Sequence, residues 1–133
     1  MKKVNLLILV LSTLFFGCEK EKTQPESLVG TWELRHVLGV QIADAPSHFE
    51  KGNGSIIEFS THEYQRIEDG TVVSEGTYEI VEESAEIDGT KFENRIIFDG
   101  DDRKVFIKLS GDELLISYGS TSHDGSTNTY EKM

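Results

Sequence analysis

The sequence predicts an all-β protein, an antiparallel up-and-down barrel of about eight strands that follows an N-terminal leader and a short linker. Two observations predict the barrel. From Leu28 onward, apolar and polar residues alternate with a period of two. Asp-Gly and Ser-Gly pairs separate these runs at short intervals, as turns between strands do. A third observation predicts the leader, because an apolar run near the N-terminus ends at the only cysteine, Cys18.

Residues 1–17 have the composition of a signal peptide. Lys2 and Lys3 precede an apolar run over residues 4–16, which is shorter than the about 20 residues of a membrane-spanning helix. The sequence Leu14-Phe15-Phe16-Gly17-Cys18 resembles the lipobox of bacterial lipoproteins, in the relaxed form found in Bacteroidota. The resemblance implies cleavage before Cys18 and acylation of its sulfur. The alternative is an ordinary secretory signal followed by an incidental thiol.

An acylated Cys18 makes the membrane the first expected partner, since each buried CH₂ of an acyl chain contributes about 0.8 kcal/mol. We therefore expect an outer-membrane lipoprotein that faces either the periplasm or the cell surface. Residues 18–27 form the linker, which has charges of both signs and one proline after the cysteine. The whole chain carries 13 Lys and Arg against 24 Asp and Glu, a net charge of −11, which argues against nucleic acid as a partner.

Residues 28–133 form the predicted barrel domain. The first strand, residues 28–40, alternates Trp32, Leu34 and His36 with charged or β-branched neighbours. Residues 41–54 then have the composition of a loop, and Ser47 is a suitable cap for a short helical turn over 45–51. The remaining strands are expected at residues 55–60, 63–68, 71–82, 92–98, 104–109, 113–118 and 127–132.

The turns between these strands are marked by residues that accept a positive φ. Asp69-Gly70 predicts a two-residue hairpin, and Asp88-Gly89 and Ser110-Gly111 mark two later turns. Gly76, inside a strand, predicts a bulge or bend, and Glu82, Glu83 and Glu86 are expected in an exposed acidic loop. About eight strands suffice to close a barrel that side chains fill or that holds one small ligand. An open sandwich is the competing architecture.

Gly30-x-Trp32, at the start of the first strand, resembles the G-x-W of lipocalins. Shorter supporting segments lie at residues 75–80, 112–116 and 129–132. Behind a lipoprotein-like leader, this pattern is similar to the small lipocalin-like domains of Bacteroidota lipoproteins, and the resemblance implies a lipocalin-like barrel with a ligand-binding interior. The arginine that packs over the lipocalin tryptophan has no counterpart here, so we expect Lys132 to take that cation–π position. Gly30 is expected to let another segment approach closely, and Trp32 to fill one end of the barrel.

The sequence contains no phosphate-binding loop, no G-x-S-x-G and no His-Glu-x-x-His, and we expect a non-enzymatic protein without catalytic residues, cofactor or metal. His48, His62 and His123 fall in separate loops. Asp99, Asp101 and Asp102 suggest calcium ligands, but they lack the full spacing of a calcium loop and a closing glutamate. A solvated turn is the preferred interpretation.

The candidate ligand contacts are aromatic or polar residues expected to face the interior: Trp32, His36, Phe59, Tyr64, Arg66, Tyr78, Tyr118 and Tyr130. Arg66 is expected either to receive a carboxylate-bearing ligand or, preferably, to pair with a nearby Glu. The predicted function is a lipid-anchored envelope protein that binds a small hydrophobic or amphipathic molecule in its barrel. The alternative is a non-catalytic module with a packed core that binds another envelope protein.

Overall fold

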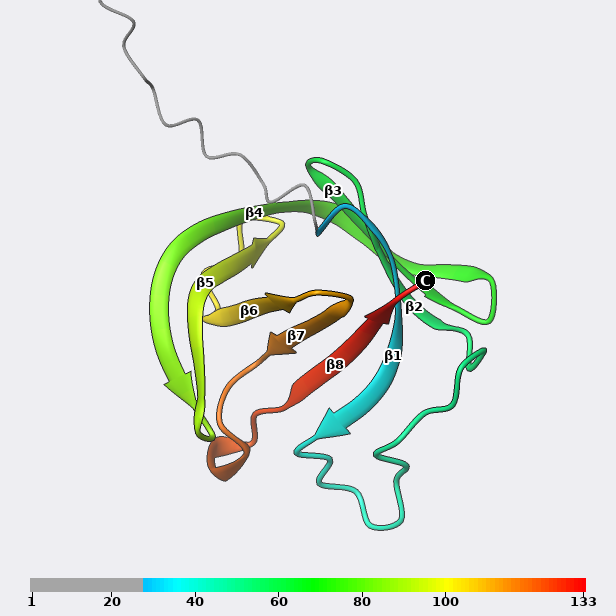
Figure 1. Ribbon diagram of the computed structural model, residues 1–133, viewed down its shortest axis with the longest axis horizontal. Helices are drawn as coiled ribbons and strands as arrows, with labels where there is room; N and C mark the ends of the chain where they lie inside the picture. The colour runs from blue at the N-terminus through cyan, green and yellow to red at the C-terminus, as the bar shows by residue number, and fades with distance from the viewer. Residues whose placement is uncertain (1–27) are drawn as a thin grey trace, which may run out of the picture.

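Eight antiparallel strands close into a barrel in the computed structural model, which describes residues 28–133 (Figure 1). Each strand pairs with its neighbour in the chain, and the last strand pairs with the first. The predicted barrel is confirmed, and the open sandwich is wrong. The strands are β1 (Gly30–Leu38), β2 (Ser55–Phe59), β3 (Glu63–Glu68), β4 (Thr71–Ile87), β5 (Thr90–Phe98), β6 (Val105–Ser110), β7 (Glu113–Ser117) and β8 (Thr127–Lys132). The predicted leader and linker, with Cys18, lie outside the described residues.

The side chains that fill the barrel form one buried cluster around Trp32, which has no exposed surface. The Trp32 indole Nε1 donates to the Leu28 carbonyl at 2.9 Å, and the Lys132 Nζ lies 5.5 Å from the centroid of the Trp32 ring. The predicted cation–π contact is therefore confirmed. The predicted close approach at Gly30 is also confirmed, because a Cβ there would lie 3.2 Å from a side-chain carbon of Lys132. The other buried members of the cluster are Leu28, Leu34, Ile57, Phe59, Tyr64, Tyr78, Ile96, Val105, Ile107, Leu114, Ile116 and Tyr130.

A β-bulge in β1 corrects the predicted position of His36. Leu34 pairs with Tyr130 and His36 with Thr129, so one extra residue, Arg35, interrupts the ladder to β8. Because successive side chains alternate between faces, the extra residue reverses the face of everything that follows it. Val37 consequently packs against the core, whereas His36 points away from the interior.

The segment between β1 and β2 contains no helical turn, so the prediction for residues 45–51 is wrong. Its backbone pairs with β1 instead: the Val37 N–H donates to Ser47 O, and the Phe49 N–H donates to Arg35 O, both at 2.9 Å. His48 forms an isolated bridge with His36, and the two rings lie 4.5 Å apart between centroids. The segment thereby pairs with the edge of β1 beyond the end of the β1–β2 ladder at Glu33.

The strand β4 extends to Ile87, five residues beyond the prediction, so the expected acidic loop is also wrong. Glu82, Glu83 and Glu86 belong to this strand, whose second half pairs with β5 across a second bulge. The Asp88-Gly89 turn joins the two strands, with φ of 49° and 80°. Its Asp88 carboxylate accepts hydrogen bonds from the Ser120 Oγ and the Thr121 N–H, which fasten the tip of this hairpin to the β7–β8 connection, near the foot of β5 in Figure 1.

Gly76 marks a close approach rather than the predicted bulge. The bulge in this part of β4 lies at Val73, between the pairs Arg66–Ser74 and Ile67–Val72. A Cβ on Gly76 would collide with the carboxylate of Asp99. Because Gly76 has no side chain, the Asp99 carboxylate can pack against the backbone of β4.

Candidate binding cleft at Arg66

The structure divides the predicted ligand contacts into two groups. Trp32, Phe59, Tyr78 and Tyr130 are at most 6% exposed and pack in the core, so their side chains occupy the interior. The Tyr78 hydroxyl donates to Ser60 O at 2.6 Å. Burial raises the pKa of Tyr130 to about 12, so it stays protonated at neutral pH.

The remaining interior candidates gather at one cleft. Tyr64, Arg66 and Tyr118 line a hollow of about 460 Å³ where β5 ends, β6 begins and β7 ends. We call it the Arg66 cleft. The other lining residues were not among the predicted ligand contacts: Ser74, Phe98, Asp99, Asp101, Arg103 and Val105.

The strand register explains why a hollow forms at Arg66. Across the β3–β4 ladder, Tyr64 faces Gly76 and Arg66 faces Ser74. The large inward side chains of Tyr64 and Arg66 therefore lie opposite the small residues Gly76 and Ser74. Space remains between these large side chains and β5. Tyr64 and Phe98 meet edge to face across this space, with 4.7 Å between ring centroids.

Arg66 is held by aromatic rings. Its guanidinium carbon lies 5.1 Å from the centroid of Tyr64 and 4.9 Å from that of Phe98, and its Nη2 donates to the Tyr118 hydroxyl oxygen at 3.0 Å. Among residues 28–133, no carboxylate lies within ion-pair distance of Arg66. The predicted pairing with a nearby Glu is therefore not found in this part of the chain.

Asp99 is the acid that organises this end of the barrel. Its carboxylate accepts a hydrogen bond from the Tyr64 hydroxyl at 2.6 Å and from the Thr77 N–H at 2.9 Å. These two hydrogen bonds, the Tyr64 one first, lower the pKa of Asp99. Burial, and then the same hydrogen bond, raise the pKa of Tyr64. At neutral pH the cleft thus contains a protonated phenol and an ionised carboxylate that already has two donors.

The aspartate-rich connection between β5 and β6 is a turn held by its own side chains. Asp101 accepts hydrogen bonds from the backbone N–H and the side-chain Nε of Arg103, at 3.0 and 2.9 Å. Within residues 28–133, His, Cys, Asp and Glu side chains form no group of three or more that could hold a metal ion. Arg103 is thus the cleft's second arginine, and unlike Arg66 it already has a carboxylate.

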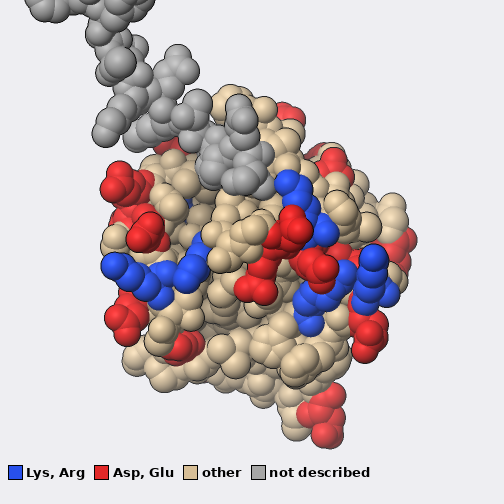
Figure 2. Space-filling view, in the orientation of Figure 1, with Lys and Arg blue, Asp and Glu red and all other residues tan. Residues whose placement is uncertain are grey.

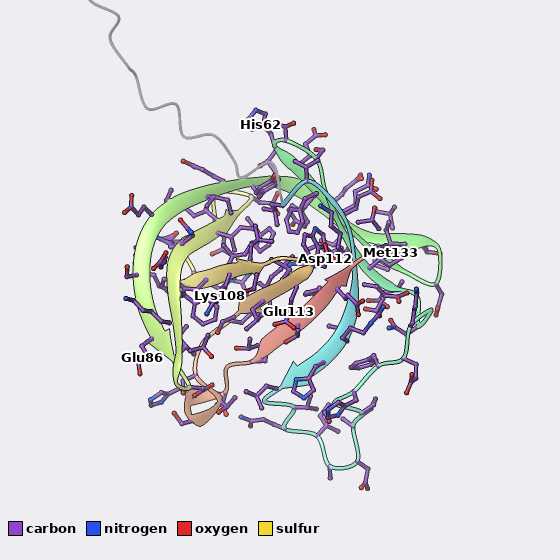
Figure 3. All side chains as sticks on the ribbon, in the orientation of Figure 1. His62, Glu86, Lys108, Asp112, Glu113 and Met133 are labelled. Carbon is purple, nitrogen blue, oxygen red and sulfur yellow. The ribbon has the colours of Figure 1, made fainter. Side chains whose placement is uncertain are left out.

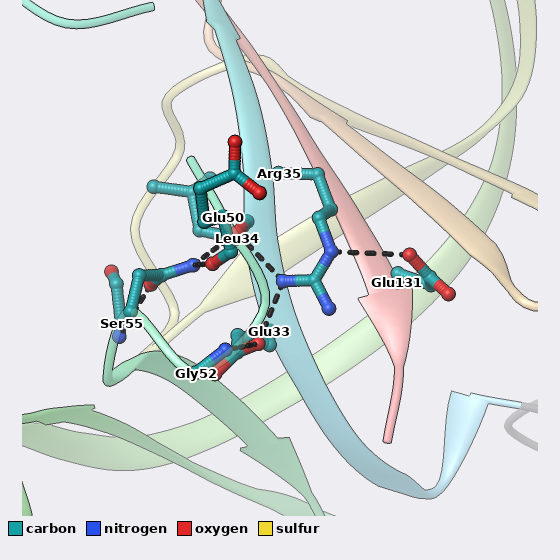
Figure 4. A network of polar contacts seen from close by, with 8 residues as sticks. Glu33, Leu34, Arg35, Glu50, Gly52, Ser55 and Glu131 are labelled. Atoms are coloured by element: carbon teal, nitrogen blue, oxygen red, sulfur yellow. Dashed lines mark hydrogen bonds and ion pairs between the residues drawn. The ribbon is translucent and has the colours of Figure 1, made fainter. Parts of the chain in front are cut away.

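A second polar network, outside the interior, surrounds Glu33 (Figure 4). Glu33 is 2% exposed and accepts hydrogen bonds from the Gly52 N–H at 2.8 Å and the Arg35 Nη1 at 2.7 Å. The Arg35 Nε bonds the Glu131 carboxylate at 3.1 Å. The Gly52 N–H first, and then Arg35, hold the pKa of Glu33 below its usual range. This network ties the β1–β2 segment to β1 and β8 and is structural.

The protein is thus a closed eight-stranded antiparallel barrel, with a filled interior and a polar hollow at one end. Comparison with family models, curated proteins and solved structures finds no match for this chain. No helix within residues 28–133 has the length and apolarity to cross a membrane.

Proposed function

We propose that this protein is a lipid-anchored, non-catalytic binding protein of the cell envelope, and that its ligand is a small amphipathic molecule with an anionic group. The observation that carries the proposal is the Arg66 guanidinium, which lies in a hollow without a carboxylate partner among residues 28–133. Such a group favours binding an anion, because a guanidinium presents a planar fork of donors that matches a carboxylate.

The surroundings of Arg66 suit both halves of an amphipathic ligand. The Tyr118 hydroxyl oxygen accepts a hydrogen bond from Arg66, so the Tyr118 hydroxyl proton points away from the guanidinium. The Tyr118 hydroxyl can therefore act as a second donor to an anion. Phe98 and Val105 line the same hollow and offer apolar surface. The volume of about 460 Å³ falls within the about 300–1,000 Å³ usual for small-molecule sites.

The location of the protein follows from the leader. A basic start, an apolar run and a Gly17-Cys18 pair support acylation of Cys18 and attachment to the outer membrane. Residues 19–27, at about 3 Å per extended residue, give the barrel a short reach from the lipid surface. Mass spectrometry of the exported protein tests this part. We expect a diacylglyceryl group on Cys18 as the first residue, and an unmodified thiol there contradicts the anchor.

Calorimetry with benzoate tests the ligand class on the full-length protein in lipid nanodiscs, with empty nanodiscs subtracted. We expect benzoate to bind and neutral benzamide to bind at least about tenfold more weakly, because a charge-assisted pair is lost. Arg66→Gln should abolish the difference between the two compounds. The matched control is Arg103→Gln, which removes the other arginine of the cleft and should have the smaller effect. Equal binding of benzoate and benzamide contradicts the proposal.

One observation favours the alternative, a protein-interaction module. The interior is packed, and apolar side chains at the end of β1 and in the following segment are exposed: Leu38 at 47%, Val40 at 37% and Ile42 at 76%. This function predicts a single stoichiometric partner captured from envelope extracts. Replacement of Val40 and Ile42 by serine should abolish the capture and leave benzoate binding unchanged.

A further inference from the structure

The wall of the barrel is weakest between β5 and β6. These strands share three residue pairs, from Asn94–Ile107 to Ile96–Val105, which is the shortest of the eight ladders. Beyond Asn94, β5 pairs with β4 alone, and beyond Ile107, β6 pairs with β7 alone. In Figure 1 the two strands diverge from their shared end.

A slot of about 390 Å³ occupies this divergence. Its apolar lining comes from Ile80, Ile107 and Leu109, which belong to the core or pack against it. Ile107 is buried, whereas Ile80 and Leu109 are partly exposed. The slot therefore gives access to the apolar interior through the side of the barrel, separately from the Arg66 cleft.

The rim of the slot carries two exposed lysines. Lys91 lines it from β5 and Lys108 from β6. Figure 3 labels Lys108. Neither forms an ion pair within residues 28–133, although Glu86 is the cross-strand neighbour of Lys91 and Glu93 also lines the slot. Lys104, by contrast, bonds Glu83 at 2.8 Å. Two cations that have no ion pair within residues 28–133 therefore lie beside an apolar slot.

We infer that the β5–β6 slot is a second binding site, which takes a free single-chain amphiphile with an aliphatic tail and an anionic headgroup. The tail lies against Ile80, Ile107 and Leu109, where burial of its methylenes is favourable, and the headgroup lies between Lys91 and Lys108. A volume at the lower end of the usual range for small-molecule sites suits one chain better than the two chains of a phospholipid. The inference does not depend on the Arg66 cleft.

Photolabelling tests the site on the full-length protein in nanodiscs. The probe is laurate with a diazirine near the end of its chain, and labelled residues are mapped by peptide mass spectrometry. We expect label on the strand segments that contain Ile80, Ile107 and Leu109, removed by excess unlabelled laurate. Lys91→Gln with Lys108→Gln should lower the labelling about fivefold, as expected for the loss of two exposed charge contacts. Lys51→Gln, an exposed lysine in the β1–β2 segment, is the matched control and should change nothing.

Further arms separate the competing outcomes. Leu109→Trp should block the slot and abolish the labelling, and the lysine variant remains informative if this one fails to fold. Three results overturn the inference. Laurate and lauryl alcohol could label the slot equally, or the lysine variant could label like the wild type. The third is a diazirine-bearing phospholipid in the nanodisc that labels the slot better than laurate. Labelling confined to the Arg66 cleft, lost in Arg66→Gln, also overturns the slot and supports the proposed function.

Discussion

Arg66 is kept at the end of the barrel by contacts that do not neutralise it. Two aromatic rings and a hydroxyl oxygen hold the guanidinium in place, yet its charge remains available. Glu33 is the opposite case, because its carboxylate is almost fully covered and its donors are supplied by Gly52 and Arg35. The first arrangement is suited to binding, and the second to stability.

Trp32 should be the most costly single residue to remove. Its ring is fully buried in the core, so Trp32→Ala should lower the free energy of unfolding by about 3–5 kcal/mol. Urea denaturation of the full-length protein measures this loss. Trp32→Phe, which keeps a ring at the site, should cost clearly less. A loss below about 1 kcal/mol for Trp32→Ala contradicts the packed core.

Glu33 should make stability depend on acid pH. The folded-state pKa of Glu33 lies below its usual range, so its contribution is fully present above the unfolded pKa and disappears as the pH falls through the folded one. Glu33→Gln should therefore lower stability at neutral pH, by about 1.5–3 kcal/mol for lost charged hydrogen bonds. Its effect should shrink as the pH falls below about 4. A pH-independent difference between wild type and variant in denaturation curves is the contradicting result.

At the scale of elements, alternation and turn residues suffice to predict that each of the eight strands exists. They do not predict where the β-bulges lie, and the bulges determine which face a side chain occupies. The extra residue at Arg35 moves His36 off the inner face, and the one at Val73 replaces the expected bulge at Gly76. A one-residue shift depends on how the neighbouring strand pairs, which no local pattern records. The second half of β4 is acidic and alternates only weakly, so the sequence pattern does not predict it as a strand. Its pairing with β5 makes it one, and no local pattern records that pairing.

A double-mutant cycle tests the seating of Asp99 against β4. Gly76→Ala alone should destabilise the protein by about 1–3 kcal/mol, because the new methyl group collides with the Asp99 carboxylate. In an Asp99→Ala background the same substitution should cost much less, since the obstructing group is gone. Equal costs in the two backgrounds, measured by urea denaturation, show that Asp99 is not what Gly76 accommodates.

Hydrogen exchange should find the least protected ladder between β5 and β6. Three residue pairs hold this junction, and opening it exposes little further backbone. We expect the amides of residues 94–96 and 105–107 that bond across this ladder to exchange faster than those between β1 and β8. The contradicting result is uniform protection around the barrel.

At the scale of the whole molecule, the closed barrel leaves no unpaired edge along most of its circumference, and its shortest ladder lies between β5 and β6. Acidic and basic side chains are interspersed on the face seen in Figure 2, so no large field of one sign directs a partner there. Of the candidate site, Tyr64, Arg66 and Tyr118 could be predicted from alternation alone. Asp99 and Ser74 could not, because their place in the cleft depends on how β4 passes β3 and β5.

The central claim is that a ligand binds at Arg66 and not around the only tryptophan in a hollow interior. A nitrogen-detected NMR titration of the nanodisc-bound protein with benzoate tests it most directly, since the Arg66 guanidinium and the Trp32 indole each give a distinct signal. We expect the Arg66 signal to shift with saturation while the Trp32 signal stays in place. A saturable shift of the Trp32 signal with an unchanged Arg66 signal would contradict it.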